Sequence, residues 1–482
     1  MSSTEESNHE QAGQRALSKA LVLVAGAAVS ALQPPRLLLG VLAVACIAIG
    51  GSLLDAVGTS SWQRTIDAAH TEDAQQRLQA AMQDTGRRLG LEEASDPPNI
   101  GELRTALRRD FLESRGGLED PEERLELESR YLDELGALEE LEPCGPFEAT
   151  MRGAGLELGR FVEGVIEVRP GDSLVALSRL AYQIPLLLWS GDPFVAILLA
   201  LLIGFCFALF GGAIARLDAL ETGLRLKPTA WDGLEFAWSN IQKLLQSVLL
   251  PLAVVAILSG LLAIVGIPFN LPVLDVLGGI IYGLSIALSL VSAVLLVGYG
   301  AMMPMLVGSV GVERCDAGES IQSSWGSVMA RPGHFLLLLG AGLACFAIGL
   351  ALVDVIVVLA LDVAATSWGG IVSGGAMRSA GTFTALDFTF DNLPSTTSGT
   401  ATAAGALVSF WEQLLIALLL GYVFSWIATI GTRLFLAMRF IVDKQSPSVI
   451  WLPGTLGGST VQVEERPEAR FESEDTFSEG PR

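Results

Sequence analysis

The sequence predicts an all-α integral membrane protein with six transmembrane helices. Hydrophobic residues make up 51% of the chain and charged residues only 17%, and the mean hydropathy is +0.51, which lies outside the range of soluble globular proteins. A hydrocarbon core of about 30 Å needs roughly 20 apolar residues in a helix. The sequence has six such runs, at 37–57, 194–215, 244–267, 276–303, 335–361 and 406–430. They are continuous rather than alternating, which favours helices over barrel strands.

The basic residues indicate how the six spans are oriented, because Lys and Arg are enriched in short cytoplasmic loops. They lie in alternate loops and in both terminal flanks: Arg15, Lys19, Arg36, Arg216, Arg225, Lys227, Lys243, Arg314, Arg331, Arg433, Arg439 and Lys444. The opposite loops at 266–275 and 363–405 hold only Arg378. The sequence therefore predicts that both termini lie in the cytoplasm.

These spans divide the chain into seven parts. They are a cytoplasmic N-terminus with an interfacial helix (1–36), a first span (37–57), an extracytoplasmic helical domain (58–192), a core of four spans in two hairpins (193–363), an outer loop rich in Gly, Ser and Thr (364–405), a last span (406–430) and a cytoplasmic tail (431–482). The tail is acidic and is expected to be disordered beyond about residue 457. The apolar run at 20–31 is interpreted as the interfacial helix, and a cleaved signal peptide is the alternative.

The predicted outer domain is acidic, with roughly twice as many Asp and Glu residues as Arg and no Lys. Helix-start residues precede three amphipathic stretches, at 72–83, 100–117 and 124–141. A fourth helix follows Pro146. A fifth stretch at 172–191 has the aromatic residues of a membrane interface and is expected to be too short and too interrupted to span. Because the amphipathic faces must be covered, residues 70–190 are predicted to bind a protein partner or a further copy of the chain.

The four-span core shows a weak internal repeat. Aligning Trp238 with Trp325 also pairs Asp232 with Glu319, and each copy would place a Trp-bearing amphipathic helix between two spans. Chance similarity between two amphipathic helices is the alternative.

The sequence lacks the residue patterns of an enzyme or a metal protein. The histidines His9, His70 and His334 are scattered, and the chain has no Cys-x-x-Cys, phosphate loop or Gly-x-Ser-x-Gly motif. We therefore predict no catalytic, cofactor-binding or metal-binding residue. The net charge of −22 also disfavours a nucleic-acid partner.

Four acidic residues within or beside the spans are the candidates for an ion or polar site: Asp55, Asp275, Asp354 and Glu412. Ionisable groups at membrane depth are costly and indicate function. Solvated residues at span ends are the alternative, since even Asp354 lies about 19 residues into its span, nearly the full hydrocarbon thickness. In the fourth span, Gly279, Gly283 and a series of serines favour close contact between helices.

Several segments together resemble a known group of proteins. They read GGAIARLDALETGLRL, ESIQSSWGSVMARPGHFLLLL and TRLFLAMRFIVDKQSPSVIWLPG, with QPPRLLLGVLAV and PCGPFEA. The chain resembles, over about residues 33–453, a family of uncharacterised multi-pass membrane proteins predicted from planctomycete genomes. The resemblance implies the same layout of interfacial helix, span, helical outer domain, four-span core and last span. It also implies a place in the bacterial cytoplasmic (inner) membrane, and it carries no activity.

The leading functional hypothesis is a non-enzymatic structural, assembly or partner-binding protein in the lipid bilayer. The alternative is a transporter or channel with an acidic outer vestibule. An intramembrane enzyme is a third hypothesis, for which the sequence offers no nucleophile and base pair.

Overall fold

The computed structural model describes residues 3–57, 62–63, 87, 100–116, 123, 127, 130–131, 134, 143–266, 275–369 and 399–452. These residues are helical except for loops and one antiparallel pair of two-residue strands, β1 (Trp62–Gln63) and β2 (Pro143–Cys144). Six helices are long and apolar enough to cross a membrane, which confirms the predicted multi-pass helical class. The predicted helices at 72–83 and 124–141, most of the loop 364–405 and the tail beyond residue 452 lie outside the described residues.

The six spans agree with the apolar runs to within a few turns. They are α3 (Pro34–Val57), the continuous helix α10 (Pro193–Cys206), η3 (Phe207–Gly211) and α11 (Gly212–Leu224), then α13 (Ile241–Gly266), α14 (Asp275–Glu313), α16 (Pro332–Gly369) and α17 (Gly399–Val442). The π-helical turn η3 rotates the face that α11 presents relative to α10.

The last span, α17, is the helix on which most of the others pack. It contacts α3, α11, α14 and α16, and also the N-terminal helices α1 (Ser3–Ala25) and α2 (Ala27–Ser30). In its most apolar stretch 56% of the residues are buried, compared with 6% in α14. The last span, which the sequence analysis separated from the four-span core, is therefore the centre of the packing.

Glycine residues allow α17 to cross its neighbours at very short range. A Cβ atom added to Gly40 of α3 would lie 2.2 Å from the carbonyl oxygen of Gly421, and one added to Gly431 would lie 2.0 Å from the carbonyl oxygen of Pro304 in α14. Small residues at such crossings let helix backbones approach, which is how membrane helices gain van der Waals contact.

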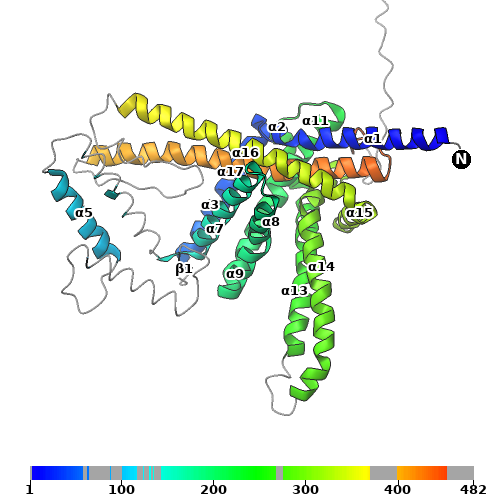
Figure 1. Ribbon diagram of the computed structural model, residues 1–482, viewed down its shortest axis with the longest axis horizontal. Coiled ribbons are helices and arrows are strands. Elements are labelled where there is room, and N and C mark those ends of the chain that lie inside the picture. Colours follow the sequence, from blue (N-terminus) through cyan, green and yellow to red (C-terminus); the bar gives the residue numbers. More distant parts are fainter. Residues whose placement is uncertain are drawn as a thin grey trace, which may run out of the picture.

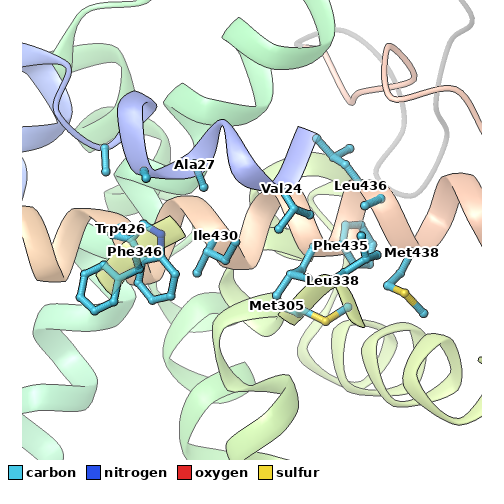
Figure 2. Close-up of a cluster of buried hydrophobic side chains, with 14 of the residues drawn as sticks. Val24, Ala27, Met305, Leu338, Phe346, Trp426, Ile430, Phe435, Leu436 and Met438 are labelled. Atoms are coloured by element: carbon cyan, nitrogen blue, oxygen red, sulfur yellow. The ribbon is translucent and has the colours of Figure 1, made fainter. Parts of the chain in front are cut away.

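The spans converge at one end and separate at the other (Figure 1). The C-terminal ends of α11, α14 and α17 and the helices α1 and α2 meet in one region, here called the junction. From the junction the pair α16–α17 and the pair α13–α14 run in different directions. The buried cluster beneath α1 includes Val24 and the stacked rings of Phe346 and Trp426, whose centroids are 4.1 Å apart (Figure 2).

Two short helices at the junction carry the same N-terminal structure at positions that the sequence repeat pairs. Helix α12 (Ala230–Ser239) begins with a capping box between Thr229 and Asp232. Helix α15 (Ala317–Ala330) begins with a capping box between Asp316 and Glu319. The alignment that pairs the two tryptophans also pairs these caps. Each preceding span ends beside an arginine with a left-handed backbone, Arg225 or Arg314, with a φ of 55°.

The second half of the predicted outer domain packs against the spans. Helix α5 (Ile100–Gly116) belongs to its first half, and the second half comprises α7 (Pro146–Ile166), α8 (Pro170–Ser178), η2 (Arg179–Gln183) and α9 (Ile184–Gly191). Helix α7 contacts both α3 and α16. Helices α8, η2 and α9 follow one another without a break, because the π-helical turn precedes Pro185, a residue that cannot donate a helical hydrogen bond.

Candidate functional site: a buried ion-pair network at the junction

A buried carboxylate on α11 lies between two arginines at the centre of the junction. Asp218 is fully buried and accepts hydrogen bonds from Arg433 of α17 at 3.0 and 3.2 Å. On its other side, Nη1 of Arg36 of α3 lies 2.9 Å from Oδ1. The hydroxyl of Ser30 donates to the same oxygen at 3.3 Å. One aspartate therefore joins α2, α3, α11 and α17.

A second carboxylate completes the network one turn later on the same helix. Glu221 forms an ion pair with Arg36 and accepts a hydrogen bond from the Gln33 amide at 2.5 Å. Arg433 in addition donates to the carbonyl oxygen of Leu23 in α1 at 3.1 Å. The network thus holds two acids and two arginines, and its formal charges cancel.

Helix α1 leaves space for this network because a glycine ends it. A Cβ atom on Gly26 would lie 2.6 Å from Nη1 of Arg433. A charge taken out of water is tolerated only where it is paired and hydrogen-bonded, and both conditions hold for Asp218. The network therefore fixes the N-terminal helices to α3, α11 and α17.

A second set of arginines, the buried Arg216 and the half-buried Arg314, binds the segment that follows α17. Arg216 donates to the carbonyl oxygens of Gly311 and Trp451, each at 3.0 Å, and its guanidinium lies 4.8 Å from the centre of the Phe236 ring. Arg314 lies 4.5 Å from the centre of the Trp451 ring. These contacts are cation–π interactions.

A further ion pair holds the end of α17. Arg439 is buried and pairs with Glu313 at the end of α14, at 2.7 Å. It also donates to the carbonyl oxygen of Val449. Together with Arg216 and Arg314, it folds residues 443–452 back over the junction.

Sequence reasoning missed this network because it assigned the arginines to topology alone. Arg36, Arg216, Arg314, Arg433 and Arg439 were expected as loop and flank charges, and the structure places Arg36, Arg216 and Arg439 inside the protein and Arg433 almost so. One sequence feature could have indicated this network. Asp218 and Glu221 are two acids one helical turn apart, in a stretch whose other charged residues are basic.

The four acids predicted as an ion or polar site lie on four different helices. Asp55 on α3 accepts hydrogen bonds from the backbone N–H groups of Phe147 at 2.9 Å and Glu148 at 3.0 Å, so it caps the N-terminus of α7. Asp354 on α16 is half-buried, and its Oδ1 has no hydrogen-bond partner among the described residues. Asp275 begins α14 and Glu412 lies in α17, and their side chains are outside the described part of the chain.

The charged groups of the junction hold helices together, and the features below do not indicate a reactive centre. This ion-pair network of Arg36, Asp218, Glu221 and Arg433 is called the clamp below. Both oxygens of Asp218 already accept hydrogen bonds from arginine, and the side chain is fully buried, so this carboxylate is not accessible to a substrate. Burial, together with the nearby Glu313, raises the pKa of the Cys315 thiol to about 12, so the thiol stays protonated and unreactive at neutral pH. Within the described residues no group of three or more His, Cys, Asp or Glu side chains could hold a metal ion.

Comparison of the chain with protein-family models, with curated proteins and with solved structures finds no match.

Proposed function

We propose that this multi-pass membrane protein is a non-enzymatic scaffold, which assembles with a partner protein or with further copies of itself through an exposed helix face. The observation that carries this proposal is the α13–α14 pair, which extends away from the junction with little cover (Figure 1). Only 6% of the residues in the most apolar stretch of α14 are buried. The junction supplies a fixed base for this arm, since its charges are paired internally.

The exposed face of α14 has the residues that membrane helices use for association. Gly279, Gly283 and Ala287 follow one another at intervals of four, so they lie on one face, and all three are exposed. A Cβ atom on either glycine would meet no atom within 4 Å. Ser285 and Ser292 are half-buried and belong to a different face. A small-residue stripe lets a second helix approach closely, and lipid chains do not require it.

The sequence predicts that residues 70–190 bind the partner, whereas this proposal assigns partner binding to the exposed face of α14. Helices α7, α8 and α9 from that range pack on each other and on the spans, and the leucine-rich stretch at 124–141 lies mostly outside the described residues. The prediction for 124–141 stays a prediction.

We expect Gly283→Leu to weaken association by about tenfold or more, equivalent to about 1.4 kcal/mol, because the side chain blocks close approach of a second helix. The measurement is chemical cross-linking in native membranes, followed by purification of the tagged chain. The matched control is Gly300→Leu, because Gly300 lies on the same helix and also has open space around it. Equal cross-linking of wild type and both variants would contradict the proposal.

Transport is the second candidate function, and Asp354 is the observation that favours it. An ionisable side chain within a span, with a carboxylate oxygen unpaired among the described residues, is the usual mark of an ion or proton pathway.

If the protein transports cations, liposomes containing it should show a flux that Asp354→Asn reduces at least about tenfold, because the neutral amide removes the charge that attracts the ion. Flux is read from a cation-sensitive dye trapped in the vesicles. Asp443→Asn, an exposed change outside the spans, serves as the control. An absence of flux for wild-type protein of correct fold would exclude this candidate.

A further inference from the structure

Helices α7 and α8–η2–α9 form a hairpin that lies alongside the spans. Helix α7 has 21 residues, and the second arm runs without interruption from Pro170 to Gly191. At a rise of about 1.5 Å per residue each arm is about 30 Å long, which equals the thickness of the hydrocarbon core. Helix α7 contacts α3 and α16, and α9 contacts α10. Both arms therefore have membrane spans as neighbours.

The base of the hairpin is level with the ends of the spans that lie away from the junction. Asp55, which caps α7, is two residues before the end of α3. The second arm ends at Gly191, and α10 begins at Pro193, capped by Asp192.

The tip of the hairpin lies toward the junction. Phe161 and Val162 near the end of α7 and Ala176 in α8 belong to the same buried cluster as Ala28 and Ala31, which immediately precede α3. Helix α7 therefore runs back along α3, from its far end to its beginning. The chain reverses at Val168, which has a left-handed φ of 58°.

The outward face of the second arm is apolar. Leu174, Val175, Tyr182, Leu186 and Trp189 each expose about half of their surface or more. The neighbouring spans present similar side chains on the same molecule, for example Phe194 and Leu201 of α10. Exposed apolar side chains of this kind match lipid chains.

The charges of the hairpin fall into two groups. Within the arms, Arg152 pairs with Glu148 at 3.0 Å, and Arg160 and Arg179, whose side chains are about half-exposed, share Glu157 at 2.5 and 3.5 Å. Exposed charges gather near the tip, beside a groove of about 310 Å³ between α7 and α8; they are Glu163, Glu167, Arg169 and Asp172.

These exposed charges exclude a tip that ends within hydrocarbon, where each charge would cost about 2.5–3.5 kcal/mol or more. The hairpin therefore either lies wholly outside the bilayer or crosses it completely. Packing of α7 along α3 favours the complete crossing. An arginine at the tip also fits the enrichment of basic residues in cytoplasmic loops.

We propose that α7 and α8–η2–α9 cross the bilayer as a seventh and an eighth membrane helix, with lipid chains covering their apolar face and residues 167–172 on the same side as the junction. This arrangement replaces the expected outer placement of residues 146–191 and does not depend on the assembly function.

Single-cysteine labelling tests which side the tip occupies. The five natural cysteines are first replaced by alanine, and three variants are then compared: Val168→Cys at the tip, Lys227→Cys at the junction and Ser190→Cys at the base of the hairpin. A membrane-impermeant maleimide is applied to sealed vesicles before and after permeabilisation. We expect Val168→Cys to react on the same side as Lys227→Cys and opposite to Ser190→Cys.

Two results would overturn the proposal. One is reaction of Val168→Cys on the side of Ser190→Cys, and the other is a folded Val168→Cys variant that reacts on neither side. If the cysteine-free chain does not fold, a protease site inserted beside the exposed Gly171 in the natural chain gives the same information. Cleavage only from the junction side supports the crossing, and cleavage from the other side, or from neither, rejects it.

Discussion

Replacing Asp218 by Asn is expected to destabilise the protein by about 3–5 kcal/mol, because it leaves buried arginine charge without its counter-charge. Arg433 would lose the only carboxylate that it contacts in the described structure, while Arg36 would keep Glu221. The measurement is thermal unfolding in mild detergent, read from the fraction of monodisperse protein that survives heating. Asp443→Asn, an exposed acid just after α17, is the control and should change the midpoint little.

A double substitution separates the loss of stability caused by an unpaired buried charge from the loss caused by altered packing. The double variant Asp218→Leu with Arg433→Met removes one acid and one base together and retains the pair of Arg36 and Glu221. Since a buried ion pair can often be replaced by apolar groups at small cost, the double variant should recover much of the stability that Asp218→Leu alone loses. If the double variant loses as much stability as the two single variants lose in sum, Asp218 and Arg433 of the clamp do not stabilise the protein as a pair.

Replacing Gly40 by Leu should prevent the correct packing of α3 on α17. Even a Cβ atom would lie 2.2 Å from the carbonyl oxygen of Gly421 and 2.9 Å from its carbonyl carbon, so the two backbones would have to separate. Overpacking in a core costs about 1–3 kcal/mol, and displacement of two helix backbones places this change at the upper end or beyond. The same heating assay measures it.

The control for this change is the same substitution in open space. Gly300→Leu adds an identical side chain where a Cβ meets no atom within 4 Å, and it should leave the unfolding midpoint close to that of wild type. Equal stability of the two variants would show that the crossing of α3 and α17 is not close.

The spans could be predicted from the sequence because a single physical requirement defines them. A helix that crosses lipid needs about 20 apolar residues, and this requirement is local. The predicted run 37–57 and the observed α3 differ by less than one turn. The capping boxes of α12 and α15 are also local, since each links residues three apart.

The centre of the packing could not be predicted, because it depends on partners that are distant in the sequence. Gly40 and Gly421 are ordinary span glycines until the two helices are placed in contact. Likewise, a positive charge near a span end looks the same in the sequence whether it faces water, as Lys227 does, or an acid inside the protein, as Arg36 does. The topology rule predicts the side of the membrane and not the burial.

For the candidate acids too, the local features could be predicted from the sequence and the contacts with distant residues could not. Depth along a span could be judged from the sequence, but the role of Asp55 depends on the N-terminus of α7, about 90 residues later. From the sequence, the second arm of the hairpin is expected to be interrupted, and it contains Pro185, a residue that disrupts an ideal α-helix. In the structure a π-helical turn precedes Pro185 and the helix continues to Gly191. The position of such a turn is not evident from the sequence.

The native mass of the purified particle in mild detergent tests the scaffold most directly. We expect a particle larger than one chain of 50.9 kDa, formed by further copies or by a protein partner in fixed proportion, and reduced to the single chain by Gly283→Leu. A single wild-type chain that carries only lipid, with unchanged mass in the Gly283→Leu variant, would contradict the proposed scaffold function.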